Sequence, residues 1–374
     1  MKRLIALLLT LTLLLCACGG QPQETDPSEA PTETVTEAPT ETPTEAPTEA
    51  PTEAPTEEAT EAPTEPPVIY RHPLTGAILD APHTTRIVSL SIGNTYDAMP
   101  TLGLSQADMV FEMYVNQLCT RLLALYGDPT GVPAIGSIRS HRYHFTDISR
   151  SYDTLAFHAG YSDAVGVYTK RAGIDHMNVD TNGETSYSFR DKPRNASGLA
   201  MMHCLMAKGD GLYAAAEKKG YSVAFNPEKV YPMNFTDGQA LTEGDSANSI
   251  TLTFRLKGST KKSIFAYNAE TGLYEFTQYG KAMSDGNNGE PLAFRNLFFL
   301  FAETWTDADG YHVSTLIGSG EGHFACDGYM IPIQWHRESD SDPFSFTLAD
   351  GTPLVQGVGS SYIAIAPTES SLES

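Results

Sequence analysis

The pattern of apolar and polar positions divides the folded part of the chain near residue 225. Before this point, short apolar runs alternate with amphipathic stretches. The apolar runs predict strands and the amphipathic stretches predict helices. The expected strands are 86–91, 110–115, 121–126 and 155–158, and the expected helices are 105–109, 145–152, 163–171 and 199–219, the last broken at 209–211. This alternation indicates an α/β layered domain over residues 68–225.

From residue 249 onward the apolar positions follow the two-residue period of strands. The expected strands are 249–257, 263–267, 273–279, 296–304, 312–317, 330–335, 344–348 and 361–366. Turn pairs such as Asp309-Gly310 and Asp350-Gly351 separate several of them. We therefore expect a mostly antiparallel β domain over residues 226–374, which makes the protein α+β or α/β as a whole.

A glycine-rich run and several aromatic residues of this second part can each be interpreted as functional or as structural. The run IGSGEG (317–322) is similar to a phosphate loop, but neither a helix nor a Lys follows it, so a hairpin turn is expected. Trp305, Trp335 and the run 298–301 could stack on sugars. Their alternation with polar residues favours a place in the core instead.

The first 17 residues have the features of a lipoprotein signal peptide. A basic start, Lys2-Arg3, precedes the apolar run 4–15, which is shorter than the roughly 20 residues of a membrane helix. The run ends in Leu15-Cys16-Ala17-Cys18, which resembles a bacterial lipobox. We expect cleavage after Ala17 and acylation of Cys18, for example with palmitate, on the extracytoplasmic face of the cell membrane. An ordinary secretory signal is the alternative.

Residues 18–67 are the lipidated cysteine and the predicted tether that follows it. The unit Thr-Glu-Ala-Pro recurs every four residues, and residues 21–67 contain no aromatic residue, Lys or Arg. Frequent proline blocks helices, and so little apolar surface cannot offset chain entropy. We expect a disordered linker with a reach of up to about 150 Å.

Net charge and cysteine content argue against several kinds of ligand and cross-link. The formal charge is −22, and 13 of the 46 acidic residues lie in the tether. Residues 68–374 keep 33 acidic and 22 basic residues, a net charge of −11, which argues against nucleic acid as a partner. Cys119, Cys204 and Cys326 allow one disulfide at most, and none is expected. No metal-binding spacing is present, and neither a metal nor a cofactor is expected.

Many short segments of the chain, in one order, resemble the YerB-like lipoprotein family of Gram-positive bacteria. The matching segments are HPLTG (72–76), GLSQADMVFE (103–112), IGSIRSHRY (135–143), FHAG (157–160), FRD (189–191), YNAETGLY (267–274), IGSGEGHFACDG (317–328) and YIAIAP (362–367). The resemblance covers residues 70–370 and implies a lipid-anchored protein with an α/β part, a β part and no established activity. The sequence departs from the family at 115–119, His141 and Cys204, which puts any site there in doubt.

A basic segment, GSIRSHRYHF (136–145), stands out in this acidic chain. Since guanidinium groups bind carboxylates and phosphates, an anion site is predicted near the ends of strands. If a helix begins at Ser140, its amino end adds to this attraction. The candidate anion-binding residues, at polar positions shared with the family, are Arg121, Arg139, Arg142 and Arg190. The candidate acid–base residues, at further shared positions, are Glu112, His158 and His203.

Three hypotheses follow for these residues. Arg139 and Arg142 could pair internally with carboxylates such as Glu112, Asp108, Asp147 or Asp153. They could instead bind a peptidoglycan carboxylate, an anionic wall polymer or envelope proteins. A wall-active enzyme with a Glu112/His158 pair is the third. The sequence lacks the usual hydrolase and L,D-transpeptidase motifs, so a non-enzymatic envelope-binding or accessory lipoprotein is the leading expectation and an enzyme the alternative.

Overall fold

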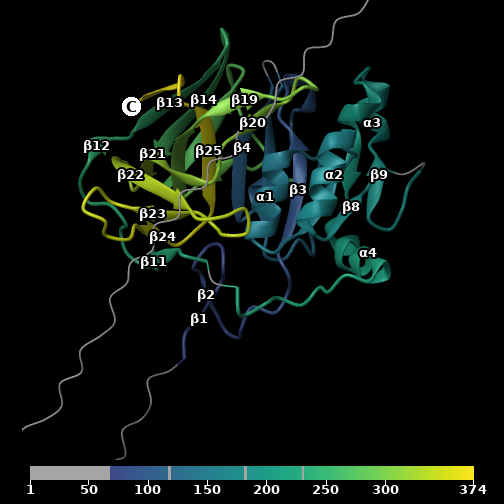
Figure 1. Ribbon diagram of the computed structural model, residues 1–374, viewed down its shortest axis with the longest axis horizontal. Helices are drawn as coiled ribbons and strands as arrows, with labels where there is room; N and C mark the ends of the chain where they lie inside the picture. Colours follow the sequence, from purple (N-terminus) through teal and green to yellow (C-terminus); the bar gives the residue numbers. More distant parts are fainter. Residues whose placement is uncertain (1–67, 117–118, 181–182, 230) are drawn as a thin grey trace, which may run out of the picture. The chain divides into compact units, whose positions relative to one another are not determined.

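One large mixed sheet runs through both predicted parts of the chain (Figure 1). The structure is a computed structural model that describes residues 68–116, 119–180, 183–229 and 231–374; the predicted signal peptide and tether lie outside these ranges. In spatial order the strands are β12 (Asp245–Ser246), β22 (Tyr329–Arg337), β21 (Gly318–Cys326), β18 (Asn296–Ala302), β25 (Ser361–Pro367), β4 (Met109–Asn116), β5 (Cys119–Tyr126), β3 (Val88–Gly93), β7 (Leu155–His158) and β8 (His176–Asn178), with β23 (Ser345–Thr347) beside β22.

Besides β22, which shares their direction because β21 is antiparallel to both β18 and β22, six strands of this sheet run in the same direction. Strand β25 is parallel to both β18 and β4, and β3 is parallel to β7, which is parallel to β8. Strand β5 lies antiparallel between β4 and β3, so these two also share a direction. The carboxyl ends therefore lie along one edge, which we call the carboxyl edge: Ala302, Pro367, Asn116, Gly93, His158 and Asn178.

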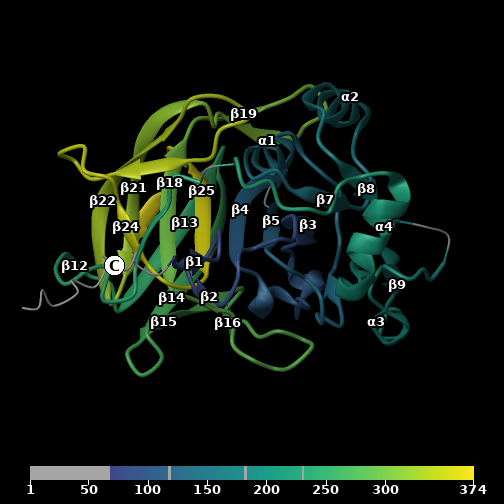
Figure 2. The ribbon, with the colours of Figure 1, turned by 90° about the horizontal axis from the view of Figure 1, so that it is seen from below.

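Both faces of the large sheet are covered (Figure 2). One face packs against a six-stranded antiparallel sheet in the C-terminal part, and against β6, β9, β10 and α4 in the N-terminal part. Helix α1 covers the other face, and α2 packs beside α1. The six-stranded sheet contains β13 (Ser249–Leu256), β14 (Ser259–Asn268), β15 (Leu273–Gln278), β16 (Lys281–Ala282), β17 (Ala293–Phe294) and β26 (Ser371–Glu373).

The remaining elements are short. The helices are α1 (Tyr143–Ser151), α2 (Asp163–Ala172), α3 (Lys192–Ala196) and α4 (Leu212–Lys219), with 3-10 turns η1 (Tyr96–Ala98), η2 (Leu104–Gln106), η3 (Met201–His203) and η4 (Gly209–Gly211). The small sheets contain β1 (Tyr70–Arg71), β2 (Ile78–Leu79), β6 (Ile135–Gly136), β9 (Ser188–Arg190), β10 (Leu205–Ala207), β11 (Asn234–Thr236), β19 (Thr304–Thr306), β20 (His312–Ser314) and β24 (Val355–Gly357). Among the helices of the described ranges, none is long and apolar enough to cross a membrane.

Strand β4 shows why the sheet is buried on both sides. Val110 and Tyr114 pack in the cluster that includes the six-stranded sheet. Phe111 and Met113 point the other way and pack in the cluster that includes α1. A strand buried on both faces has a nearly continuous apolar sequence, as β4 does. Glu112 is the exception, and its carboxylate faces the six-stranded sheet.

The Glu112 carboxylate accepts five hydrogen bonds in this completely buried position. Asn94 Nδ2, Thr120 Oγ1 and Lys261 Nζ donate to Oε1 at 2.9, 2.7 and 2.5 Å. Ser263 Oγ and Tyr362 OH donate to Oε2 at 2.9 and 2.7 Å. The donors come from the loop after β3 and from β5, β14 and β25, so one carboxylate links both parts of the chain.

The electrostatics of this cluster favour an ion pair. Burial alone would raise the pKa of Glu112, but the Lys261 charge and the hydrogen bonds of Lys261, Thr120 and Tyr362 outweigh it and hold that pKa below its ordinary value. Burial lowers the pKa of Lys261, and the Glu112 carboxylate opposes this shift. Each charge therefore depends on the other, because neither has water to replace its partner.

The structure corrects the expected helix over 105–109. Only the 3-10 turn η2 forms there, and its N-cap is Gly103. Ser105 donates its N–H and its hydroxyl to Asp285 Oδ2 at 2.9 and 2.8 Å instead of capping a helix. Asp108 accepts a hydrogen bond from Gly127 N at 2.6 Å.

The expected helix over 199–219 is right only in its second half, where α4 begins at Leu212. The first half contains η3 and the three-residue strand β10, which pairs with β6 and β9. Local apolar spacing cannot separate a short buried strand from a buried helix segment. The tertiary pairing of β10 decides the outcome.

The run 317–322 is a strand and not a hairpin turn, because β21 begins at Gly318. A Cβ on Gly320 would lie 2.6 Å from the indole ring of Trp335, so glycine lets this ring cross the strand. Trp335 is 3% exposed, and residues 298–300 are buried, as the core prediction requires. Trp305 is 52% exposed, so the core prediction is wrong for this residue.

We expect removal of either partner of the buried ion pair to destabilise the protein strongly. Lys261→Met or Glu112→Gln should each lower the free energy of unfolding by about 3–5 kcal/mol, because each leaves the other group without its partner. The combined variant should lose less than the sum of the two single losses. Urea unfolding of residues 18–374 carrying Cys18→Ser would measure this.

Lys262→Met is the matched control, since Lys262 is the next residue on β14 and is exposed. It should change the free energy of unfolding by less than about 0.5 kcal/mol. Additive losses in the combined variant would show that the two groups are not coupled.

Candidate functional site

The basic segment lies across the carboxyl ends of β3 and β7. Arg139 N donates to Ser91 O of β3 at 2.7 Å, and Ala159 N, just beyond β7, donates to Arg139 O at 2.9 Å. His141 N donates to Gly160 O at 2.9 Å. The segment is therefore bonded to both parallel strands at the carboxyl edge, which is where α/β sheets bind ligands.

Helix α1 begins at Tyr143, two residues before the expected helix over 145–152, so the condition of a start at Ser140 is not met. Arg142 is its N-cap and has an extended backbone, and no side chain caps the helix. Arg139 thus lies outside the helix. The amino end of α1 still adds positive potential next to the basic segment.

Three arginines meet at this segment without a carboxylate partner. Arg121 Nη1 donates to Ser140 O at 2.6 Å, and Arg142 Nη1 donates to His141 O at 2.7 Å. Arg139 Nη1 donates to Met202 O at 2.9 Å. Within the described ranges, no Asp or Glu oxygen lies within 4.0 Å of these guanidinium groups. Neutral groups hold them in place, namely these carbonyls and, for Arg142, the Tyr311 ring 4.1 Å from its Cζ, and none of these groups carries a neutralising charge.

The carboxylates that were expected to pair with Arg139 and Arg142 have other partners, so the internal-pairing hypothesis is wrong. Glu112 binds Lys261, and Asp153 binds Arg86 at 2.8 Å. Asp147 accepts from Tyr168 OH at 2.6 Å. Asp108 accepts from a backbone N–H and lies 3.8 Å from His72.

Arg190, the fourth candidate, lines a pocket together with Arg139. Arg190 Nη1 donates to Met201 O at 2.7 Å, and Nη2 pairs with Asp180. The pocket has a volume of about 200 Å³. Its walls are Ile138, Arg139, Ser140, Ala159, Asp180, Arg190, Met202 and Leu205. We call it the arginine pocket.

The surroundings make this region electropositive. Burial, with the nearby charge of Arg142, lowers the pKa of Arg121 to about 9. Burial also lowers the pKa of Arg139 and of Arg142. Burial raises the pKa of the Cys119 thiol, while the charges of Arg121, Arg139 and Arg142 oppose that rise. An added anion would relieve the mutual repulsion of these groups.

The proposed Glu112/His158 acid–base pair is not formed. Strands β4 and β7 are separated by β5 and β3, which places them about 14 Å apart. His158 Nδ1 lies 3.1 Å from Gly160 O, so this nitrogen carries the proton. Nε2 therefore accepts from His176 Nδ1 at 3.0 Å. Burial lowers the pKa of His158 to about 3, so its imidazole is neutral.

His203 and Cys204 do not act on each other either. The Cys204 thiol lies 3.5 Å from Ala200 O and donates to that carbonyl. Burial lowers the pKa of His203, and the Arg139 charge adds to the shift, which places this histidine near the arginine pocket. Cys119, Cys204 and Cys326 are free thiols.

A stack of imidazoles beside the basic segment was not predicted. The His141 and His158 rings lie 5.0 Å apart, and the His158 and His176 rings lie 5.2 Å apart. His141 was noted only as a departure from the family, because residues from three separate segments carry no common sequence pattern. In the part of the chain that the structure describes, no group of three His, Cys, Asp or Glu residues is placed to hold a metal ion.

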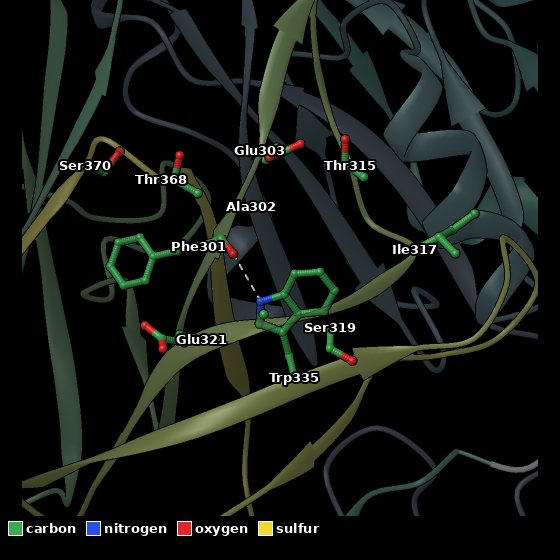
Figure 3. A pocket seen from close by; sticks show the side chains of 11 residues that line it. Phe301, Ala302, Glu303, Thr315, Ile317, Ser319, Glu321, Trp335, Thr368 and Ser370 are labelled. Atoms are coloured by element: carbon green, nitrogen blue, oxygen red, sulfur yellow. Dashed lines mark hydrogen bonds between the residues drawn. The ribbon is translucent and has the colours of Figure 1, made fainter. Parts of the chain in front are cut away.

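A second pocket lies at the carboxyl ends of β18 and β25 (Figure 3). Its volume is about 570 Å³, and Trp335 forms part of its wall, with Nε1 donating to Phe301 O at 3.2 Å. Glu303 and Glu321 are exposed at its sides, with hydroxyl groups from Thr315, Ser319, Thr368 and Ser370. It contains no basic residue and has the opposite charge to the arginine pocket.

The buried histidines predict how stability depends on pH. Burial lowers the pKa of His144 to about 3 and shifts that of His141 in the same direction. Below about pH 6.5 the unfolded chain binds protons at these positions and the folded chain does not. Stability should therefore fall as the pH drops from about 6.5 toward 3. Burial raises the pKa of Asp108 and Asp147 to about 6, which opposes this trend over a narrower range.

We expect the melting temperature of the wild type to fall by about 5–10 °C between neutral pH and about pH 4.5, a loss of a few kcal/mol. His144→Phe should reduce this fall, because one neutral buried imidazole is removed. His336→Phe is the matched control for the loss of a histidine, since His336 is exposed. Equal slopes for wild type and His144→Phe would contradict the assignment.

Comparison with known proteins supports the resemblance seen in the sequence. Residues 74–222 match the N-terminal domain, and residues 250–363 the C-terminal domain, of "Protein of unknown function (DUF3048)". The "Putative lipoprotein YerB" of Bacillus subtilis (strain 168) is 26% identical over 301 residues, which cover 79% of this chain and 86% of that protein. A crystal structure of YerB from B. subtilis has a similar fold, with a TM-score of 0.70 and 24% identity over 81% of this chain and 99% of that chain.

These matches confirm the predicted family and the strand-rich fold with an N-terminal and a C-terminal part. The chain belongs to the DUF3048 family, whose members include YerB-like lipoproteins and whose function is unknown.

Proposed function

We propose that the protein is a lipid-anchored, extracytoplasmic binding protein that holds an anionic group of the cell envelope at the arginine pocket. The observation that carries this proposal is the cluster of Arg121, Arg139 and Arg142 without a carboxylate partner among the described residues. Buried charges are normally paired, because desolvation is costly. A ligand that supplies the missing negative charge would remove this cost.

The location follows from the first 18 residues. The lipobox-like sequence before Cys18 supports an acylated amino terminus on the outer face of the membrane. The name of the B. subtilis relative, "Putative lipoprotein YerB", agrees with this interpretation. The acidic tether would carry the folded part away from the membrane into a Gram-positive wall. Envelope carboxylates and phosphates are the anions within its reach.

Binding is favoured over catalysis because the candidate catalytic groups are apart. Glu112 is sealed in an ion pair, and His158 is bonded to His176. Nucleophilic catalysis needs a nucleophile, a base and an orienting group in contact. Cys119 is not activated as a nucleophile: its thiol donates to Thr120 O, and burial raises the pKa of this thiol. No observation favours the wall-active enzyme as a second candidate.

The anion-binding proposal predicts a specific loss of wall binding. The processed chain, residues 18–374 with Cys18→Ser, should bind purified wall sacculi in a salt-sensitive way, since charge pairs at accessible sites are screened by ions. Arg139→Gln should weaken this binding by about 10-fold or more, a change of about 1.4 kcal/mol. Co-sedimentation with sacculi would measure it.

Arg71→Gln is the matched control. Arg71 lies on β1, is paired with Asp237 and does not line the arginine pocket. It should bind as the wild type does. Undiminished binding by a folded Arg139→Gln variant would move the site away from the arginine pocket, and the acidic pocket of Figure 3 would become the next candidate.

The anchor is tested separately in cells. Cys18→Ser should move the protein from the membrane fraction to the soluble or secreted fraction, because the acylation site is lost. Cys16→Ser is the matched control and should keep the protein at the membrane, since Cys16 lies before the expected cleavage point. Fractionation with an antibody would decide this, and a Cys18→Ser protein that stays on the membrane would refute the lipid anchor.

A further inference from the structure

We infer that the arginine pocket takes a phosphate group with at least two negative charges, such as a phosphate monoester or a diphosphate, on a ligand whose neighbouring portion is apolar. This inference rests on the proposed anion binding and narrows the ligand class. A single carboxylate is the competing occupant. The charge of the site, its free donors, its size and its rim each bear on the choice.

The charge of the site exceeds what a carboxylate can offset. Arg121, Arg139, Arg142 and Arg190 gather around the segment 138–142, and Asp180 is the one carboxylate bonded to any of them in the described ranges. Three positive charges are therefore left without a counter-ion: that of Arg139 in the pocket wall, and those of Arg121 and Arg142 outside it. A phosphate monoester carries about −1.5 to −2 at neutral pH, and a diphosphate carries more. In a partly buried site the more highly charged ligand gains more electrostatic binding energy.

Free donors are available for such a group. Each guanidinium has five N–H groups, and Arg139 uses one of its nitrogen atoms for Met202 O. Arg142 is 5% exposed and does not line the pocket, and its guanidinium carbon lies 4.1 Å from the centroid of the Tyr311 ring, so it contributes charge and not a direct donor. The uncapped amino end of α1, a helix of nine residues, adjoins Arg142. Arginine forks and helix amino ends are both common features of phosphate sites.

The size of the pocket limits what enters it. Its volume of about 200 Å³ lies below the range of about 300–1,000 Å³ for sites that enclose a drug-sized ligand. The pocket can thus hold a head group, while the rest of the ligand must lie outside. The residues at the mouth of the pocket therefore determine which chemical group can be attached to the bound head group.

Exposed apolar side chains lie at the pocket wall or close to it in the chain, and Met202 is the one among them that lines the pocket. Met202 lines the pocket and is 55% exposed, and its neighbour Met201 is 50% exposed. Tyr161, 43% exposed, follows Gly160, whose carbonyl is bonded to the basic segment, and its ring lies 5.3 Å from His158. Methionine and tyrosine are adaptable contacts for apolar groups. An apolar chain attached to the phosphate would cover these side chains, so an amphiphilic phosphate fits best.

The experiment compares four soluble probes on the processed chain, residues 18–374 with Cys18→Ser. The probes are acetate, inorganic phosphate, pyrophosphate and geranyl diphosphate, and calorimetry without divalent metal would give each affinity. We expect pyrophosphate to bind at least about 10-fold more tightly than acetate, with phosphate between them. Geranyl diphosphate should bind more tightly than pyrophosphate, because its chain reaches the methionine rim.

Two sets of variants separate the parts of the site. Arg139→Gln should weaken every phosphate probe by about 10-fold or more, while Arg139→Lys, which keeps the charge, should weaken them less. Met201→Ser/Met202→Ser should remove only the advantage of geranyl diphosphate over pyrophosphate, since the backbone carbonyls that hold the arginines stay in place. Arg71→Gln should behave as the wild type throughout.

The outcomes distinguish this inference from the proposed function. If acetate binds wild type as tightly as pyrophosphate, the phosphate assignment fails, although wall binding that needs Arg139 would still support the proposed function. If geranyl diphosphate gains nothing over pyrophosphate, the apolar part of the inference fails. If no anion binds and wall binding ignores Arg139→Gln, both proposals fail. Vesicles with a phosphate monoester lipid, compared with phosphorylated wall saccharides, would then identify the source of a confirmed phosphate.

Discussion

The buried ion pair of Glu112 and Lys261 is the contact on which the arrangement of both chain parts depends. Five donors from three strands and a loop must reach one carboxylate at once, and no water can replace any of them. Apolar side chains would tolerate a small shift of β14 against β4. The Glu112 carboxylate does not tolerate such a shift, because each lost hydrogen bond leaves a buried charge less well satisfied. The pair therefore fixes how the two sheets face each other.

The same constraint reaches the carboxyl edge. Asn94, which donates to Glu112, comes directly after β3. Its neighbour Gly93 pairs with Arg121 on β5, and a Cβ on Gly93 would lie 3.0 Å from Arg139 Cγ. Glycine at this position lets the Arg139 side chain lie close against the end of β3. The site is thus built on strand ends that the buried ion pair holds in place, and not on a free loop.

Local patterns in the sequence predicted those elements whose residues decide their own structure. The strand at 155–158 and the helix from Asp163 were predicted correctly, because apolar spacing and a Ser162 cap lie within the segment. The strand β10 was missed, since three residues have no period of their own. The partner of Glu112 could not be found either, as Lys261 lies 149 residues away. The arginine pairing was wrong for a related reason: the sequence gives the number of carboxylates but not their positions.

The uncompensated charge at the carboxyl edge contrasts with the opposite end of the same strand. Arg86, just before β3, is also largely buried, and it is paired with Asp153 at 2.8 Å and Asp175 at 2.6 Å. This acidic chain can therefore supply two carboxylates to one arginine where structure alone requires it. At the other end of β3, three arginines receive carbonyls and, for Arg142, the face of the Tyr311 ring, but no carboxylate from the described residues. Departures from local pairing rules in a well-satisfied fold tend to occur at functional sites. The missing carboxylates are thus better explained by an anionic ligand than by a fold unable to provide them.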